Sequence, residues 1–234
     1  MKKQTIKFVD YIILVPGLQF SLEFLTSWSQ MLCQFYDKGY SFYYNIQYNP
    51  MVHSVRNNLL TTQFLGETIS SVERHPIDEK NLFANQMKCK KVIFVDSDMV
   101  WTPEQMQMLV DSPHPVTVAP YVLSNGKKTS VAIDGFFLSF DELNKHETYF
   151  PVDVSGMGFV AIDFEVLEKL KFPFFETYYM PYPYENPDNI KDPITLMGED
   201  ASFFTKIKEA GYEIMCDPAI RVGHQKPRIL IAGK

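Results

Sequence analysis

Two acidic pairs and one histidine have residue types and spacing that suit metal binding and proton transfer. Asp96 and Asp98 are separated by one serine, Ser97, and follow directly on the apolar run Val92–Val95. Two carboxylates this close repel each other unless a cation or strong donors compensate, and hard oxygen ligands suit Mg²⁺ or Mn²⁺. An acidic pair after a strand can also cap the turn that follows, so the pattern alone leaves both interpretations open.

The second pair, Glu199 and Asp200, begins an expected helix over Glu199–Ala210. Acidic residues stabilise helix N-termini, which is sufficient reason for their presence. Beside a bound substrate, however, such a residue can act as a general base toward a hydroxyl. His224 ends an expected apolar strand, Ile220–His224, where a lone histidine is more often a core residue than a ligand. The presence of the two acidic pairs makes it a candidate metal ligand.

The elements that must position these residues alternate between strands and helices in the first half of the chain. Apolar runs bounded by turn residues predict strands at Phe8–Val15, Ser41–Tyr48, Val92–Val95, Val116–Tyr121, Val131–Phe140, Phe159–Ile162, Tyr212–Met215 and Ile220–His224. Helical spacing and capping residues predict helices from Ser21 to Gly39, over Ser54–Leu65, after Thr102, over Phe164–Leu170 and over Glu199–Ala210. This order predicts one α/β domain over 1–234 with a mixed, mostly parallel sheet, helices on both faces and a small antiparallel second sheet.

Composition limits the classes of function. The 234 residues, 46% hydrophobic and 21% charged, suit one globular domain, and the net charge of −6 argues against a general nucleic-acid binder. No apolar run reaches the ~20 residues that cross a bilayer. Three widely spaced cysteines without a paired motif indicate reduced thiols and a cytoplasmic location. The segment 176–195, rich in tyrosine and proline, is expected to be a mobile functional loop.

Five segments, taken in order, resemble glycosyltransferases of the GT-A fold over nearly the whole chain. They are Val15-Pro16-Gly17, Arg56-Asn57, Asp96-Ser97-Asp98-Met99, Gly156-Met157-Gly158-Phe159, and a C-terminal series from Gly198-Glu199-Asp200 through Ala210-Gly211-Tyr212 and Asp217-Pro218 to Gly223-His224. The aspartate-x-aspartate element alone is a weak signal, whereas all five segments in this order are considerably more specific. The absence of a Walker loop and of a Gly-x-Gly-x-x-Gly sequence lowers the odds of ATP hydrolysis or dinucleotide redox chemistry.

The resemblance implies a Rossmann-like domain that binds a nucleoside-diphosphate sugar, with UDP-sugars favoured, together with Mn²⁺ or Mg²⁺. Residues 1–121 would form the nucleotide-binding half, and 122–234 the acceptor and catalytic half. The implied metal ligands are Asp98, Asp96 and His224, and Asp96 faces the ribose or reaches the metal through water. Donor contacts are expected at Val15, Pro16, Gly17, Arg56, Asn57, Asp96, Ser97, Gly156, Gly158 and Lys226.

The segment Gly198-Glu199-Asp200 is similar to the acidic motif of inverting members, including the β-1,4-galactosyltransferases. That similarity implies Asp200 as the base toward an unknown carbohydrate or other hydroxyl acceptor, and Glu199 as a sugar-hydroxyl contact. The two glycines of Gly156-Met157-Gly158 either allow the backbone to approach a sugar or make a tight turn. Lys226 either neutralises the diphosphate or belongs to a solvated tail.

Two other functions fit parts of the sequence. The run Val92–Val100 also resembles the first motif of haloacid-dehalogenase-type phosphohydrolases, in which the first aspartate, here Asp96, is a nucleophile. Those chains place this motif near the N-terminus and add later lysine and paired-aspartate motifs, which this chain does not match convincingly. A non-catalytic nucleotide-sugar or carbohydrate-binding protein is the other alternative. Glycosyl transfer ranks ahead of both.

Overall fold

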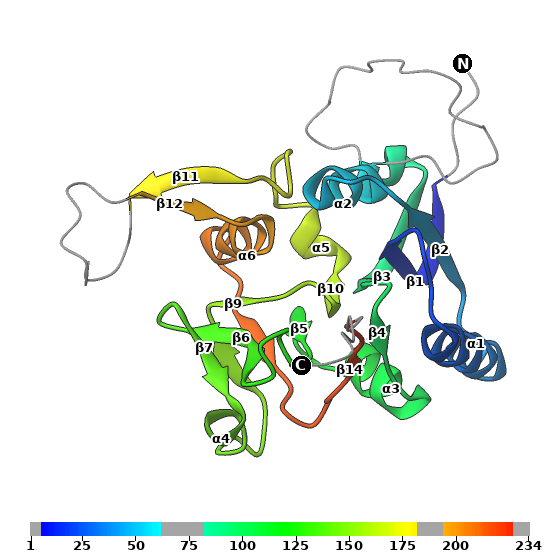
Figure 1. Cartoon of the computed structure of the whole chain (residues 1–234). Helices are drawn as coiled ribbons and strands as arrows, with labels where there is room; N and C mark the ends of the chain where they lie inside the picture. Colours follow the sequence, from blue (N-terminus) through cyan, green and yellow to red (C-terminus); the bar gives the residue numbers. More distant parts are fainter. Residues whose placement is uncertain (1–5, 62–81, 182–193, 227–234) are drawn as a thin grey trace, which may run out of the picture.

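A seven-stranded mixed sheet forms the centre of the protein. The computed structural model describes residues 6–61, 82–181 and 194–226. The strand order is β2 (Phe42–Gln47), β1 (Lys7–Pro16), β3 (Met87–Val95), β10 (Phe159–Asp163), β5 (Val116–Val118), β13 (Ile214–Cys216) and β8 (Phe150–Val152) (Figure 1). The pairings make five strands run in one direction, with β10 and β8 reversed. The predicted mixed, mostly parallel sheet is confirmed.

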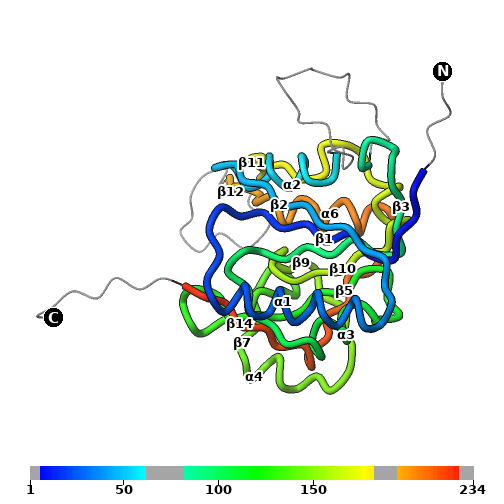
Figure 2. The backbone as a smooth tube through the Cα atoms, turned by 90° about the vertical axis from the view of Figure 1, so that its right-hand side faces the viewer, coloured from blue at the N-terminus to red at the C-terminus, as the bar shows by residue number. Residues whose placement is uncertain are grey.

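Helices cover both faces of this sheet, as predicted. On one face lie α1 (Leu22–Asp37) and α3 (Pro103–Asp111), and on the other α2 (Val52–Thr61), α5 (Phe164–Leu167) and α6 (Glu199–Glu209) (Figure 2). Successive strand residues point to opposite faces. Phe94 therefore packs in the core with α2 and α6, and its neighbours Ile93 and Val95 pack with α1 and α3. The fully apolar sequence of this strand reflects burial on both faces.

Three small antiparallel sheets complete the fold. They pair β6 (Lys128–Ile133) with β7 (Phe136–Ser139) and β9 (Val154–Ser155), β11 (Tyr178–Pro181) with β12 (Ile194–Met197), and β4 (Met99–Val100) with β14 (Gly223–His224). The predicted single strand Val131–Phe140 is wrong, because the chain reverses inside it. Asp134 and Gly135 have φ of 51° and 78°, values typical of a two-residue hairpin turn.

Several predicted boundaries also differ from the structure. The strand expected over Val116–Tyr121 ends at Val118, just before Pro120, which has no N–H to donate to a sheet. The helix expected from Ser54 begins at Val52, so Arg56 lies beyond its first turn. A further short helix is α4 (Phe140–Leu143), and η1 (Leu82–Asn85) is a single turn with positive φ at Phe83 and Ala84. The expected loop 176–195 has strands β11 and β12 at its two ends, and residues 182–193 lie outside the described part of the chain.

The predicted helix caps and the predicted end of the strand before Asp96 are confirmed. Ser21 caps α1 by accepting from the Phe24 N–H, and Thr102 forms the predicted capping box with Gln105 at the start of α3. Strand β3 ends at Val95, so Asp96 begins the loop at the carboxyl edge of the sheet, where open α/β sheets bind ligands. Among the described residues, none belongs to a helix with both the length and the apolarity needed to cross a membrane.

Candidate functional site

A pocket with a volume of about 450 Å³ opens at the ends of β1 and β3, beside the first turns of α2 and α6. It contains most of the polar residues that the sequence singled out. The lining residues are Pro16, Val52, Arg56, Asp96, Ser97, Asp98, Tyr121, Leu123, Ser124, Glu199, Asp200, His224 and Lys226. Both acidic pairs and the candidate histidine therefore face one space, although up to 128 positions separate them in sequence.

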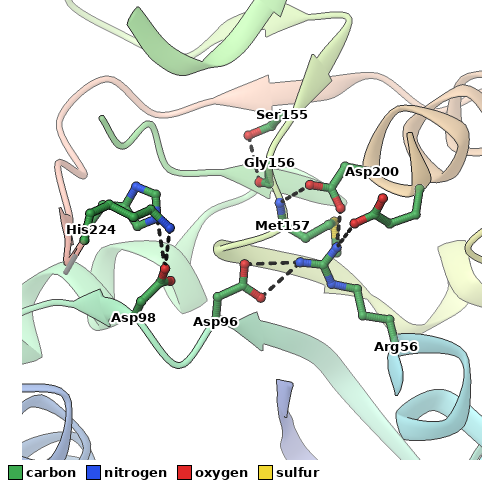
Figure 3. Close-up of polar contacts among 10 residues, drawn as sticks. Arg56, Asp96, Asp98, Ser155, Gly156, Met157, Asp200 and His224 are labelled. Atoms are coloured by element: carbon green, nitrogen blue, oxygen red, sulfur yellow. Dashed lines mark hydrogen bonds and ion pairs between the residues drawn. The ribbon is translucent and has the colours of Figure 1, made fainter. Parts of the chain in front are cut away.

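A buried arginine joins the two acidic pairs. The side chain of Arg56 is only 4% exposed, and its Nη2 lies 3.0 and 3.1 Å from the two carboxyl oxygens of Asp96. Its Nη1 contacts Glu199 at 3.3 Å and also donates to Asp200 (Figure 3). Burial alone would lower the pKa of Arg56, but the charges of its carboxylate partners outweigh burial and raise it. The sequence analysis expected this guanidinium to contact the donor, but in the structure it contacts carboxylates of the protein itself.

The environment of Asp200 suits a general base. Burial raises the pKa of this carboxyl to about 6; Arg56 opposes the rise, and the charges of Asp96 and Glu199 add to it. One oxygen accepts from the Met157 N–H at 3.3 Å, which fixes the orientation of the carboxyl group. The side chain is still 29% exposed toward the pocket. A base with a pKa just below neutral pH is ionised at pH 7 and still able to take a proton.

Asp98 and His224 form a second centre in the same pocket. The His224 Nε2 lies 3.1 Å from Asp98 Oδ2 (Figure 3), and Nδ1 lies 2.5 Å from the Val122 carbonyl oxygen. A carbonyl only accepts, so Nδ1 carries a proton and a neutral imidazole presents a lone pair to the carboxylate. Two such acceptors require a cation or a proton between them. Burial would raise the pKa of Asp98, but the contacts with His224 and Lys226 hold it below its ordinary value.

These contacts test whether the residues fit a divalent cation. Carboxylate oxygens and imidazole nitrogens are common metal ligands. In metal sites the second nitrogen of the imidazole usually donates to a carbonyl oxygen or a carboxylate, as the second nitrogen of His224 does here. Asp98 and His224 therefore fit, as a pair. Asp96 lies one residue away but directs both oxygens to Arg56. Within the described ranges, no group of three or more histidine, cysteine, aspartate or glutamate side chains could hold a metal by itself.

Tyr121 is a site residue that the sequence analysis missed. Its ring stacks edge-on against the His224 imidazole, with centroids 4.8 Å apart, and burial raises the pKa of its hydroxyl. A Cβ on Gly156 would lie 1.9 Å from the Tyr121 hydroxyl oxygen, and one on Gly158 would lie 2.9 Å from the ring. The two glycines, predicted to approach a sugar, leave space for this tyrosine. No local pattern around Tyr121 marks it, because its partners come from distant segments.

Five predicted donor contacts lie outside the pocket lining: the two glycines at 156 and 158, and also Val15, Gly17 and Asn57. Val15 is fully buried in the core. Gly17 packs against Ser97, whose Cβ would be 2.4 Å from a Cβ at that glycine. The Asn57 amide donates to the Phe175 carbonyl at 2.6 Å, and its oxygen accepts from two backbone N–H groups, of residues 174 and 175. These contacts give Asn57 a role in holding the chain after α5, and Gly17 a role in packing β1 against the aspartate loop.

Comparisons with known proteins support the fold alone. No protein-family model and no curated protein sequence matches the chain. The crystal structure of GalNAc-T7 with UDP, GalNAc and Mn²⁺ aligns with a TM-score of 0.50 at 12% identity, over 92% of this chain and 44% of that chain. The chain thus spans less than half the length of GalNAc-T7. The alignment agrees with the predicted GT-A fold.

Two other structures align slightly less well. The protein A197 from STIV has a TM-score of 0.49 at 15% identity, over 96% of this chain and 98% of that chain. The catalytic domain of Drosophila β1,4-galactosyltransferase 7, in complex with xylobiose, has a TM-score of 0.47 at 11% identity, over 95% of this chain and 72% of that chain. Identities this low show nothing about activity.

The contacts of Arg56 generate a prediction about stability. Arg56→Ala leaves three carboxylates without their shared cation, and we expect a loss of about 3 kcal/mol in the free energy of unfolding at pH 7. The deficit should shrink toward pH 5, because protonation relieves the repulsion. Urea titrations at both pH values measure it. In the matched control, Lys88→Ala breaks the exposed ion pair with Glu168 and should cost less than about 1 kcal/mol. Equal losses for the two variants would contradict the central role of Arg56.

The contacts of Asn57 separate a structural role from donor binding. Asn57→Ala removes three buried hydrogen bonds and should lower the free energy of unfolding by about 2 kcal/mol, while nucleotide affinity stays within about twofold of wild type. Urea titration and calorimetric titration with UDP measure the two effects. Asn58→Ala, on the exposed side of the same helix, is the control. A stable variant with strongly weakened nucleotide binding would instead support the donor contact that the sequence predicts for Asn57.

Proposed function

We propose that the chain is a metal-dependent glycosyltransferase that moves a sugar from a nucleoside-diphosphate sugar, UDP-sugars favoured, to a hydroxyl of a carbohydrate or other acceptor, with inversion. The observation that carries the proposal is the presence of two separate centres in one pocket. Asp98 and His224 lie together at 3.1 Å on one side, and Asp200 lies on the other, tied to Arg56. The GT-A-like fold and the UDP and Mn²⁺ of GalNAc-T7 add support.

In this proposal Asp98 and His224 hold Mn²⁺ or Mg²⁺, with Asp96 beside them, and the metal supplies Lewis-acid stabilisation of the charge that develops on the diphosphate leaving group. The Val122 carbonyl keeps the His224 Nε2 turned toward that position. Pro16, Ser97 and Lys226, which line the pocket, are donor contacts retained from the sequence analysis. Arg56 orients the acidic residues through its ion pairs and does not bind the donor directly.

On the acceptor side, Asp200 takes the proton from the attacking hydroxyl, whose oxygen bonds to the anomeric carbon as the bond from that carbon to the diphosphate oxygen breaks and the nucleoside diphosphate leaves. The Met157 N–H and Arg56 fix its carboxyl group, so little reorganisation is needed at the moment of reaction. In the proposal, Glu199, which precedes it and contacts Arg56 at 3.3 Å, accepts from a sugar hydroxyl. Attack from the side of the pocket opposite the leaving group gives inversion.

The same contacts weigh against a phosphohydrolase that uses Asp96. Both Asp96 oxygens lie 3.0 to 3.1 Å from the buried Arg56 guanidinium. A carboxylate whose two oxygens both accept from one guanidinium nitrogen is stabilised as an anion, which reduces its nucleophilicity. We therefore retain glycosyl transfer as the proposed activity. Donor binding without turnover on any acceptor would favour a binding protein.

Two substitutions separate the proposed roles. With Mn²⁺ present, a nucleotide-sugar screen by thermal shift should identify a donor that stabilises the wild type. Asp98→Ala should abolish the metal-dependent part of this shift. Asp200→Asn should keep the shift and lower the transfer rate by at least about 100-fold, since the base is lost.

The control for this experiment is Asp134→Asn, in the exposed turn between β6 and β7, which should leave both the shift and the transfer rate unchanged. Product configuration at the anomeric carbon is read by NMR. A transfer product that retains the donor configuration, or wild-type turnover by Asp98→Ala, would refute the assigned roles.

The pKa of Asp200 predicts the pH dependence of the reaction. A base whose pKa is raised to about 6 by burial is protonated below that pH, so kcat/KM should fall about tenfold per pH unit below 6 and level off above 7. Initial rates between pH 4.5 and 8 measure this profile. Since the charge of Arg56 opposes the rise, Arg56→Gln, which removes that charge, should move the midpoint to higher pH. A midpoint near 4 in the wild type would contradict a buried base.

A further inference from the structure

One carboxyl oxygen of the candidate cation site is already bound to a cation of the protein. The Lys226 Nζ lies 2.6 Å from Asp98 Oδ2, the same oxygen that faces the His224 Nε2 at 3.1 Å. A contact this short between an ammonium and a carboxylate is a charge-assisted hydrogen bond. The oxygen that would bind a divalent cation is thus occupied by a lysine.

The charges of the pocket indicate that this arrangement is incomplete. Four carboxylates line it (Asp96, Asp98, Glu199 and Asp200), and two cationic side chains, Arg56 and Lys226, face them. With a neutral imidazole, the pocket keeps a net charge of −2. One divalent cation would neutralise it, but a diphosphate brings further negative charge. A second positive charge near the diphosphate would then favour donor binding, and of the two cations that line the pocket in the described part of the chain, Lys226 is the exposed one.

The structure allows Lys226 to move without disturbing the site. Its backbone follows a fixed segment: β14 pairs with β4, and the Gln225 N–H donates to the Asp98 carbonyl oxygen at 2.8 Å. The Gln225 side chain is anchored to Glu23 at 2.8 Å. The Lys226 side chain itself is 44% exposed, and lysine carries its charge on a flexible stem. Arg56, at 4% exposure, has no such freedom.

We propose that Lys226 is an internal counter-ion of the cation site: it holds Asp98 when no divalent cation is bound, and cation binding releases it to the diphosphate of the donor. The inference rests on the proposed function and adds an order of events to it. Metal binding comes first because it must displace the ammonium, and nucleotide binding gains from the released charge. Lys226 thereby weakens metal binding and strengthens nucleotide binding.

Calorimetric titrations of the full chain test these opposite effects. For Lys226→Met, Mn²⁺ alone should bind about threefold to tenfold more tightly than to the wild type, since no ion pair has to be broken. With saturating Mn²⁺, UDP should bind about tenfold more weakly, because a charged donor is missing. The free Mn²⁺ signal in electron paramagnetic resonance checks the metal affinity independently. Lys145→Met, after α4 and outside the pocket lining, removes the same charge elsewhere and should change neither affinity.

The outcomes distinguish this inference from the proposed function. If the wild type binds Mn²⁺ and UDP but Lys226→Met leaves Mn²⁺ affinity unchanged or weakens it, the counter-ion role is wrong and the proposed function stands. If neither protein binds Mn²⁺, both are overturned. Binding of Mn²⁺ by Lys226→Met alone would support the role strongly. Thermal unfolding of each variant confirms that it is folded, so a lost affinity cannot be assigned to misfolding.

Discussion

The structure around the pocket depends on one buried charge. A guanidinium that is almost fully withdrawn from water is unfavourable unless carboxylates surround it. Arg56 meets this requirement with partners from two distant segments, Asp96 after β3 and the pair Glu199 and Asp200 at the start of α6. The same contacts fix both acidic pairs. The need to compensate one arginine therefore brings the acidic residues together before any ligand is bound.

The surrounding elements make this convergence possible. The two-sided core holds β1 and β3 parallel, so their carboxyl ends meet at one edge, where Pro16 and Asp96 lie. The short pairing of β14 with β4 then brings the end of the described chain back across this edge and sets His224 opposite Met99. Tyr121 fills the space behind the imidazole, and only glycines at 156 and 158 leave room for its ring.

Local signals in the sequence predicted the fold better than the site. The apolar run before Asp96 and the capping box at Thr102 act within a few residues, so they could be read directly. The contact of Arg56 with Asp200 joins residues 144 positions apart, and no local pattern encodes it. The resemblance to a family selected both acidic pairs and His224, which line the pocket, but gave Arg56 a ligand, where the structure gives it carboxylates. The hairpin at Asp134 was missed because the apolar alternation continued through its turn signal.

The two cations of the pocket differ in a way that matches the two halves of the proposed reaction. A base must keep its position and pKa from one turnover to the next, and Asp200 is held by a cation that is buried and cannot leave. Charge on a leaving group appears only transiently, with the donor bound, and the cation on that side, Lys226, is exposed and exchangeable. Burial decides which cation is permanent, because breaking a buried ion pair costs several times more than breaking an exposed one. Asp200 can therefore stay fixed while Lys226, on the other side of the same pocket, exchanges partners.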